Sequence, residues 1–232
     1  MPLDGAILGE GIYTPREAGR LIGASAQDVL RWTRGSGAND PIWRAHYQFL
    51  DDTTELSFVD LIELRVVRAL RKREVSLQAI RYAISLAKEK FQIDRPLSSR
   101  QFKTDGAEIL MDAVEGDGEL VSLSKRNPGQ KVFSKIVDQS VSGLEYDNNN
   151  VARWRPTSAG HVVIDPRRIF GTPILDQNGI STGALYREWR ATPDIKKLSR
   201  IYEIPEVLIK DAIGYEEHLS KMPEPSSGQS SI

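Results

Sequence analysis

Residues 14–34 read TPREAGRLIGASAQDVLRWTR, and this stretch predicts two short helices that meet at a turn of residues 23–25. Each predicted helix begins with a capping pattern, Thr14 with Glu17 and Ser25 with Asp28. Apolar residues recur at helical spacing in both halves, as Ala18, Leu21 and Ile22 and then as Ala26, Val29 and Trp32. A short turn with glycine between two such helices predicts a helix-turn-helix.

The polar face of the second predicted helix carries Gln27, Arg31 and Arg34, which fall at i, i+4 and i+7 and therefore project together. Gln and Arg contact base edges, and Arg also contacts phosphate, so one interpretation is a recognition helix in the major groove of DNA. The other is the solvated face of a small helical pair. The stretch alone leaves both interpretations open.

The segment after the helix pair predicts a wing. Residues 42–49 alternate enough in polarity for a short strand, and residues 51–54 read as a turn. Arg44 and His46 on this hairpin are candidate contacts to the DNA backbone, or else exposed residues with no such role.

Two further helices are expected next. Ser57 begins one with a capping box to Asp60, and Ser76 begins another that ends near Phe91. The second half of the first is crowded with cations, namely Arg65, Arg68, Arg71, Lys72 and Arg73. Such a cluster suits a helix C-terminus, and it also suits a basic edge lying along DNA phosphates.

Residues 13–91 resemble the winged-helix domain of MerR-type regulators. The resemblance rests on Tyr13-Thr14, Glu17-Ala18, Leu21-Ile22-Gly23, Ser25, Arg31-Trp32 and the later stretch LSFVDLIELRVVRALRKREVSLQAI. It implies DNA binding. It does not extend to metal sensing, because the chain has no cysteine.

Composition narrows the function further. The net charge is −1, so a DNA-binding face has to be a local patch. The absence of cysteine excludes disulfides, cysteine-ligated metals and a catalytic thiol, and the three histidines are scattered. We expect no metal and no cofactor. No apolar run is long enough for a membrane span and no signal peptide is apparent, so the expected location is the cytoplasm.

The middle of the chain predicts mixed structure. Residues 108–114 and 119–124 are apolar-rich runs around Gly116-Asp117-Gly118, which indicates a β-hairpin. A helix is expected over residues 132–141, a turn over 147–150 and a strand over 151–155. Four acids, Asp112, Glu115, Asp117 and Glu119, are typical of a solvated hairpin tip, with a metal site as the alternative.

Residues 162–219 predict a strand followed by three helices, which begin at Ser181 or Thr182, at Asp194 and at Pro205. The segment resembles the VapB-like antitoxin domain formerly of unknown function. The resemblance rests on Ile-Asp-Pro, Gly-x-Pro, Gly-Ile-Ser-Thr and a helix-turn-helix that ends in Ala-x-x-Tyr-Glu. One departure is the run Asp176-Gln177-Asn178, where a Gly-Thr pair is commoner in the domain.

The sequence therefore predicts a mainly helical α+β fold in four parts. These are a winged helix-turn-helix domain (1–96), an α+β middle segment with a β-hairpin (97–160), a three-helix, helix-turn-helix-like antitoxin domain (161–219) and a disordered tail (220–232). A homodimer is expected, because two-fold proteins match bacterial operators. Its interface is expected on four apolar residues, Leu185, Trp189, Tyr202 and Tyr215.

Together the two resemblances imply an antitoxin of a bacterial type II toxin–antitoxin system. Such a protein represses its own operator in double-stranded DNA and neutralises a toxin, here expected to be a PIN-like ribonuclease. The alternative is a MerR-like transcription regulator that responds to a small-molecule ligand held by residues 97–160. A third class, a hydrolase, lacks any nucleophile–base–acid set or phosphate loop in the sequence, so we predict no enzymatic activity.

Overall fold

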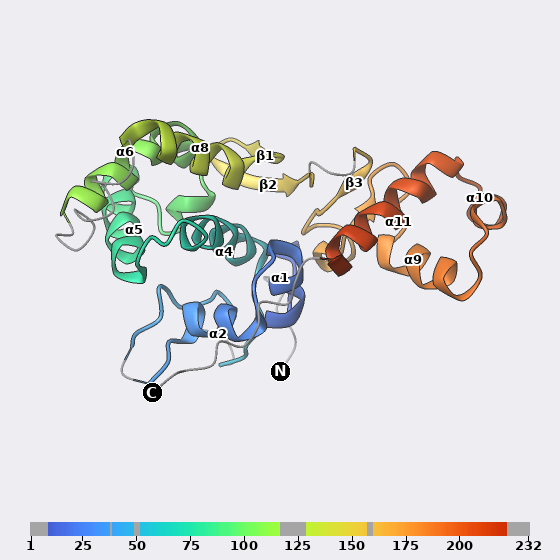
Figure 1. Cartoon of the computed structure of the whole chain (residues 1–232), viewed down its shortest axis with the longest axis horizontal. Coiled ribbons are helices and arrows are strands. Elements are labelled where there is room, and N and C mark those ends of the chain that lie inside the picture. The colour runs from blue at the N-terminus through green and yellow to red at the C-terminus, as the bar shows by residue number, and fades with distance from the viewer. Residues whose placement is uncertain (1–8, 38, 49–51, 117–128, 157–159, 222–232) are drawn as a thin grey trace. The chain divides into compact units, whose positions relative to one another are not determined.

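The structure, a computed structural model, describes residues 9–37, 39–48, 52–116, 129–156 and 160–221 (Figure 1). It is 59% helix, with two small two-stranded sheets in the described residues, which confirms the mainly helical class. The chain divides into two units. The N-terminal unit comprises residues 13–142 and 146–151, and the C-terminal unit comprises residues 1–12, 143–145 and 152–232.

The N-terminal unit is built around one buried helix. Its elements are α1 (Pro15–Ile22), α2 (Ala26–Arg34), α4 (Phe58–Arg71), α5 (Leu77–Phe91), the 3₁₀ turn η2 (Pro96–Ser98), α6 (Arg100–Gly116) and α8 (Gly129–Val141). Helix α4 contacts α1, α5 and α8, and α6 packs between α5 and α8. The apolar residues of α4 are fully buried on several sides, namely Leu61, Ile62, Leu64, Val66, Val67 and Leu70. Helix α4 therefore contributes most of its apolar residues to the core of this unit.

The capping residues place the helix starts as the sequence predicts. Thr14 and Ser57 each form a two-way capping box, with Glu17 and Asp60. The Ser25 hydroxyl accepts the backbone N–H of Asp28 and also donates to its carboxylate. Each cap satisfies an N–H group that has no partner within its own helix, which fixes where the helix begins.

The strand predicted over residues 42–49 is wrong for the residues that the structure describes. Residues 42–47 form bends and turns, and Phe49 lies outside the described residues. The alternation in the sequence does reflect burial, since Trp43 and Tyr47 are buried. The hydrogen bonds, however, go to a helix. Asp60 accepts the Trp43 indole N–H at 3.0 Å and the His46 backbone N–H at 2.9 Å. A side-chain acceptor therefore replaces the neighbouring strand.

The hairpin predicted around residues 116–118 is also wrong in its first half. Residues 108–114 belong to α6, because Phe102, Ile109, Leu110 and Ala113 form a buried stripe at helical spacing against α5 and α8. Its second half, residues 119–124, lies outside the described residues. So do Asp117 and Glu119 of the acidic run, and the described residues hold no cluster suited to a metal ion.

The hairpin of the middle segment lies later in the chain. It consists of β1 (Leu144–Asp147) and β2 (Asn150–Trp154), joined by a turn at Asn148-Asn149. The predicted helix 132–141, turn 147–150 and strand 151–155 are thus confirmed to within a few residues. Asn148 has φ 54°, a left-handed conformation that asparagine tolerates better than most residues.

The C-terminal unit packs three helices beside a short sheet. Its elements are β3 (Val162–Val163), the 3₁₀ turn η3 (Ile169–Gly171), β4 (Ile174–Leu175), α9 (Thr182–Ala191), α10 (Ile195–Tyr202) and α11 (Glu206–Lys221). The strands are antiparallel, and α11 contacts α9, α10 and both strands. Ser181 and Asp194 cap α9 and α10, which confirms the predicted helices. Helix α11 includes two residues of the predicted tail, and residues 222–232 lie outside the described residues.

Among the described helices, none combines the length and the apolar character that crossing a membrane requires.

Candidate nucleic-acid interface

The helix pair α1–α2 is held in a close turn. Gly23 ends α1 with φ 73°, in the left-handed region that glycine adopts at little cost. Inside α1, a Cβ at Gly19 would lie 2.5 Å from the carbonyl oxygen of Ala24. The Ala24 N–H donates to the Gly19 carbonyl at 2.8 Å. The second helix can start this close to the first only because position 19 has no side chain.

Helix α2 presents the face that the sequence predicts. Val29 and Trp32 are 0% and 2% exposed, so they fix which side of the helix faces the core. Gln27 and Arg31 are exposed and Arg34 is half-buried. Gln27 and Arg31 are therefore exposed on the side of α2 opposite its core contacts, and Arg34 lies on the same side of the helix.

The two arginines of this face have different partners. Arg31 pairs with Asp28, one turn earlier, and keeps 47% of its side chain exposed. A pair this exposed contributes at most about 1 kcal/mol, so Arg31 can exchange its partner at little cost. Arg34 instead donates to the Asp52 carboxylate at 2.8 Å and to the Thr53 carbonyl at 3.0 Å. Arg34 thus holds the loop that leads into α4.

Arg44 and His46 are both exposed on the segment anchored by Asp60. The Arg44 carbonyl accepts a hydrogen bond from Arg95 at 2.7 Å, and Arg95 also pairs with Asp60 at 3.2 Å. This backbone is consequently fixed, while both side chains point outward. Whether either contacts DNA stays a prediction.

A second buried acid lies one turn further along α4. Glu63 is 1% exposed, and its carboxylate accepts the Ser98 backbone N–H at 2.7 Å. Burial raises the pKa of Glu63 to about 7, and the nearby Arg95 opposes that rise. Glu63 therefore links α4 to the turn η2.

The cations at the end of α4 are largely used inside the protein. Arg65 donates to the Ser142 carbonyl at 2.8 Å, Arg68 to the Gly23 carbonyl at 2.7 Å and Arg71 to the Val75 carbonyl at 2.6 Å. Lys72 and Arg73 are exposed. The three arginines therefore stabilise the fold through hydrogen bonds to backbone carbonyls. A sequence carries no signal for such bonds, because any residue can offer a carbonyl.

Arg81 of α5 is another residue whose role has no signal in the sequence. Its guanidinium donates to the backbone carbonyls of Asp40 and Pro41, in the loop that follows α2. The end of the candidate recognition helix is therefore held from α5 as well as from the start of α4.

The residues predicted for the dimer interface differ in exposure. Leu185 and Tyr215 are 0% and 3% exposed, in helices α9 and α11, which contact each other. These two side chains therefore contribute to the core of the C-terminal unit, and their part in a dimer interface stays a prediction. Trp189 and Tyr202 are half-buried, with Trp189 stacked on Tyr186 at a centroid distance of 5.9 Å. A dimer contact through these two stays a prediction.

Exposed apolar side chains of the C-terminal unit lie elsewhere. Ile201 and Val207, at the junction of α10 and α11, are 57% and 52% exposed. Ile169 and Phe170 of η3 are 50% and 57% exposed, and both have left-handed backbone conformations that such residues rarely adopt.

Asp176 is the centre of an ion-pair network in the C-terminal unit. It pairs with Arg155 and, at 2.9 Å, with Arg168, while Arg155 also pairs with Glu145. Hydrogen bonding from Arg155 lowers the pKa of Asp176. The run 176–178, where the sequence departs from the VapB-like pattern, therefore provides the carboxylate that links Arg168, between β3 and β4, to Arg155.

Comparison with known proteins finds no matching family model. Over 221 residues the chain is 26% identical to a Mycobacterium tuberculosis protein described as "Putative antitoxin VapB45", covering 87% of this chain and 92% of that protein. The crystal structure of Rv2018 from Mycobacterium tuberculosis superposes with a TM-score of 0.70 at 26% identity, covering 87% of this chain and 96% of that one. Coverage this wide includes parts of both units.

Proposed function

We propose that the chain is a DNA-binding antitoxin whose N-terminal unit reads an operator and whose C-terminal unit takes part in toxin binding. The observation that carries the proposal is the similarity to a protein described as an antitoxin, which extends over both units. The geometry of α2 adds support, because its buried Val29 and Trp32 turn Gln27 and Arg31 outward.

The DNA contact is proposed for α2 in the major groove. Gln and Arg at positions 27 and 31 are residue types that form bidentate bonds to base edges. Arg34 and the loop that it holds are then suited to the phosphate backbone, together with Arg44 and His46. Because one recognition helix reads only a few base pairs, we propose that the protein acts as a homodimer on a two-fold operator and represses its own transcription.

The partner is proposed to be a PIN-like ribonuclease toxin, on the basis of the VapB-like pattern of residues 162–219. Exposed apolar side chains are the usual centre of a protein interface. The C-terminal unit offers Phe170, Ile201 and Val207, each more than half exposed.

The first experiment measures binding of the full chain to DNA from its own promoter by fluorescence anisotropy. The double variant Q27A/R31A should lose specific binding. The control for charge is Arg187→Ala, which replaces an exposed arginine of α9 and should leave specific binding unchanged.

The second experiment co-expresses the chain with the product of the neighbouring reading frame. Restored growth and a stable complex are expected. Retained operator affinity in Q27A/R31A would refute the DNA contact, and the absence of any complex would refute the antitoxin role.

A further inference from the structure

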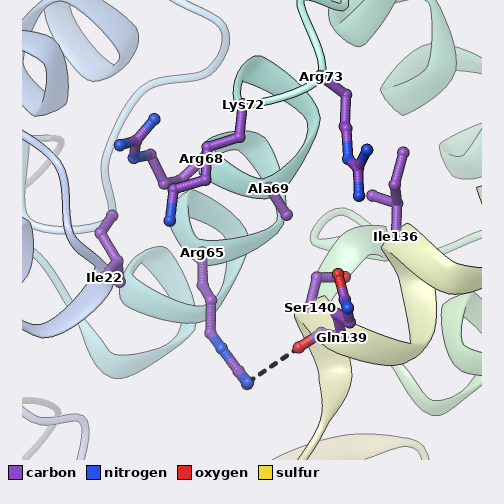
Figure 2. A pocket seen from close by; sticks show the side chains of 9 residues that line it. All are labelled: Ile22, Arg65, Arg68, Ala69, Lys72, Arg73, Ile136, Gln139 and Ser140. Atoms are coloured by element: carbon purple, nitrogen blue, oxygen red, sulfur yellow. Dashed lines mark hydrogen bonds between the residues drawn. The ribbon is translucent and has the colours of Figure 1, made fainter.

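A pocket of about 270 Å³ lies between α4 and α8 in the N-terminal unit (Figure 2). Arg65 and Arg68 of α4 line the pocket, together with Lys72 and Arg73, which follow the helix. Gln139 and Ser140 of α8 form part of the opposite wall. None of the residues that line the pocket, all of them described, is acidic. Four of the nine residues that line the pocket are therefore cationic.

The dipole of α4 does not account for this arrangement. Helix α4 ends at Arg71, and a helix dipole acts on charges within the last turn. Arg65 lies outside that turn, yet it belongs to the same pocket. The pKa of Lys72 is lowered, first by burial and then by the charge of Arg68, which indicates that these cations repel one another.

The pocket is also largely preformed. Arg65 is fixed by hydrogen bonds to the carbonyls of Gln139 and Ser142, at 3.2 and 2.8 Å. Arg68 is fixed by the Gly23 carbonyl, which uses only its Nε–H. Figure 2 shows Arg73 extending from the end of α4 toward Ile136, across from these two. A ligand that enters needs to order only Lys72 and Arg73, and such preorganisation favours binding.

We propose that this pocket binds a small phosphate-bearing anion, a phosphomonoester or a pyrophosphate. Lys72 and Arg73 are the side chains that contact it, and Arg65 and Arg68 provide fixed positive charge in the wall. A phosphate group offers up to two negative charges and three acceptor oxygens, which suits a pocket lined by guanidinium and ammonium groups. The volume is below that of sites for drug-sized ligands, so the bound molecule is small.

Duplex DNA carries the same phosphate chemistry, but its geometry suits the pocket less well. A backbone phosphate is flanked by sugars on both sides and lies on a convex surface, whereas this pocket has walls from two helices. The terminal phosphate of a small molecule can enter it end-on. The assignment is independent of the antitoxin proposal, because it rests on residues outside the face of α2.

The test is calorimetric titration of the full chain with sodium pyrophosphate and with inorganic phosphate, against chloride at equal ionic strength. Saturable binding of one pyrophosphate per chain is expected, together with a raised melting temperature. The double variant K72Q/R73Q should weaken it by at least about tenfold, because it removes two charge-assisted contacts. The matched control K88Q/K103Q removes two exposed charges from α5 and α6 and should bind as the unaltered chain does. The conservative variant K72R/R73K should retain most of the affinity.

Three results would overturn the proposal. One is no saturable binding of either anion. Another is equal weakening by K72Q/R73Q and K88Q/K103Q, which would reflect overall charge. The third is reduced operator affinity in K72Q/R73Q without any binding of pyrophosphate, which would make these residues contacts to the DNA backbone.

Discussion

Replacing Glu63 by glutamine should remove a pH dependence of stability that the fold creates. Burial raises the pKa of Glu63 from 4.5 to about 7. Below pH 4.5 the carboxyl is protonated in both the folded and the unfolded chain. Between pH 4.5 and 7 the unfolded chain loses this proton while the folded chain retains it, so the free energy of unfolding falls as pH rises. Above pH 7 both forms are ionised and this contribution becomes constant.

The magnitude follows from the shift of the pKa. Each unit corresponds to about 1.4 kcal/mol, so the shift corresponds to a loss of about 3 kcal/mol between pH 4.5 and 7. Glutamine has nearly the same shape, and its side-chain carbonyl can still accept the Ser98 N–H that Glu63 accepts at 2.7 Å. Relative to the unaltered chain, Glu63→Gln should therefore gain about 3 kcal/mol of stability on going from pH 4.5 to pH 8.

The assay is urea denaturation of both proteins at several pH values between 4.5 and 8. Glu89→Gln, at an exposed position of α5, removes the same formal charge and reports the effect of net charge alone. If the stability difference between Glu63→Gln and the unaltered chain were the same at every pH, a buried carboxyl with a raised pKa would be refuted.

Three further predictions concern α2 and the proposed dimer. Arg31→Ala should lower operator affinity by about 1–3 kcal/mol and relax preference at one base position, as measured by anisotropy on a panel of operator variants; equal affinity across the panel would contradict base readout. Trp32→Ala should lower the free energy of unfolding by about 3–5 kcal/mol in urea, because a large side chain only 2% exposed is removed; a smaller loss would mean that the core closes around the gap. Trp189→Ala should weaken the homodimer in sedimentation equilibrium while leaving the melting temperature nearly unchanged, whereas Leu185→Ala should lower the melting temperature, since Leu185 is buried.

Local capping chemistry made much of the fold predictable from the sequence. Thr14, Ser57, Ser76, Ser181 and Asp194 all cap helices where the pattern indicated. These signals work because a cap and its partner lie three residues apart, so that no tertiary contact is needed. Helical spacing also predicted Leu21 and Ile22 of α1 and Val29 and Trp32 of α2, which are buried.

The failures occur where a distant group decides the structure. Residues 42–48 alternate in burial like a strand, but the Ile42 backbone N–H donates to the Trp32 carbonyl and the His46 backbone N–H donates to Asp60 of α4. The hydrogen bonds of Arg34 and Arg68 have no signal in the sequence either, because each side chain donates to a loop or turn that is remote in sequence. Leu185 and Tyr215 are predicted for an interface, yet both side chains are buried within the C-terminal unit.

Two of these distant contacts run to or from α4. At its start, Asp60 holds the segment that carries Arg44 and His46. Near its end, Arg68 holds the Gly23 carbonyl at the turn before α2. Between them, the apolar residues of α4 are buried in the core, which fixes the position of the helix. The surface proposed to read DNA is therefore positioned by a helix that carries none of the proposed base contacts. Since Arg68 also lines the pocket between α4 and α8, an anion bound there would act on the turn before α2 through a single side chain.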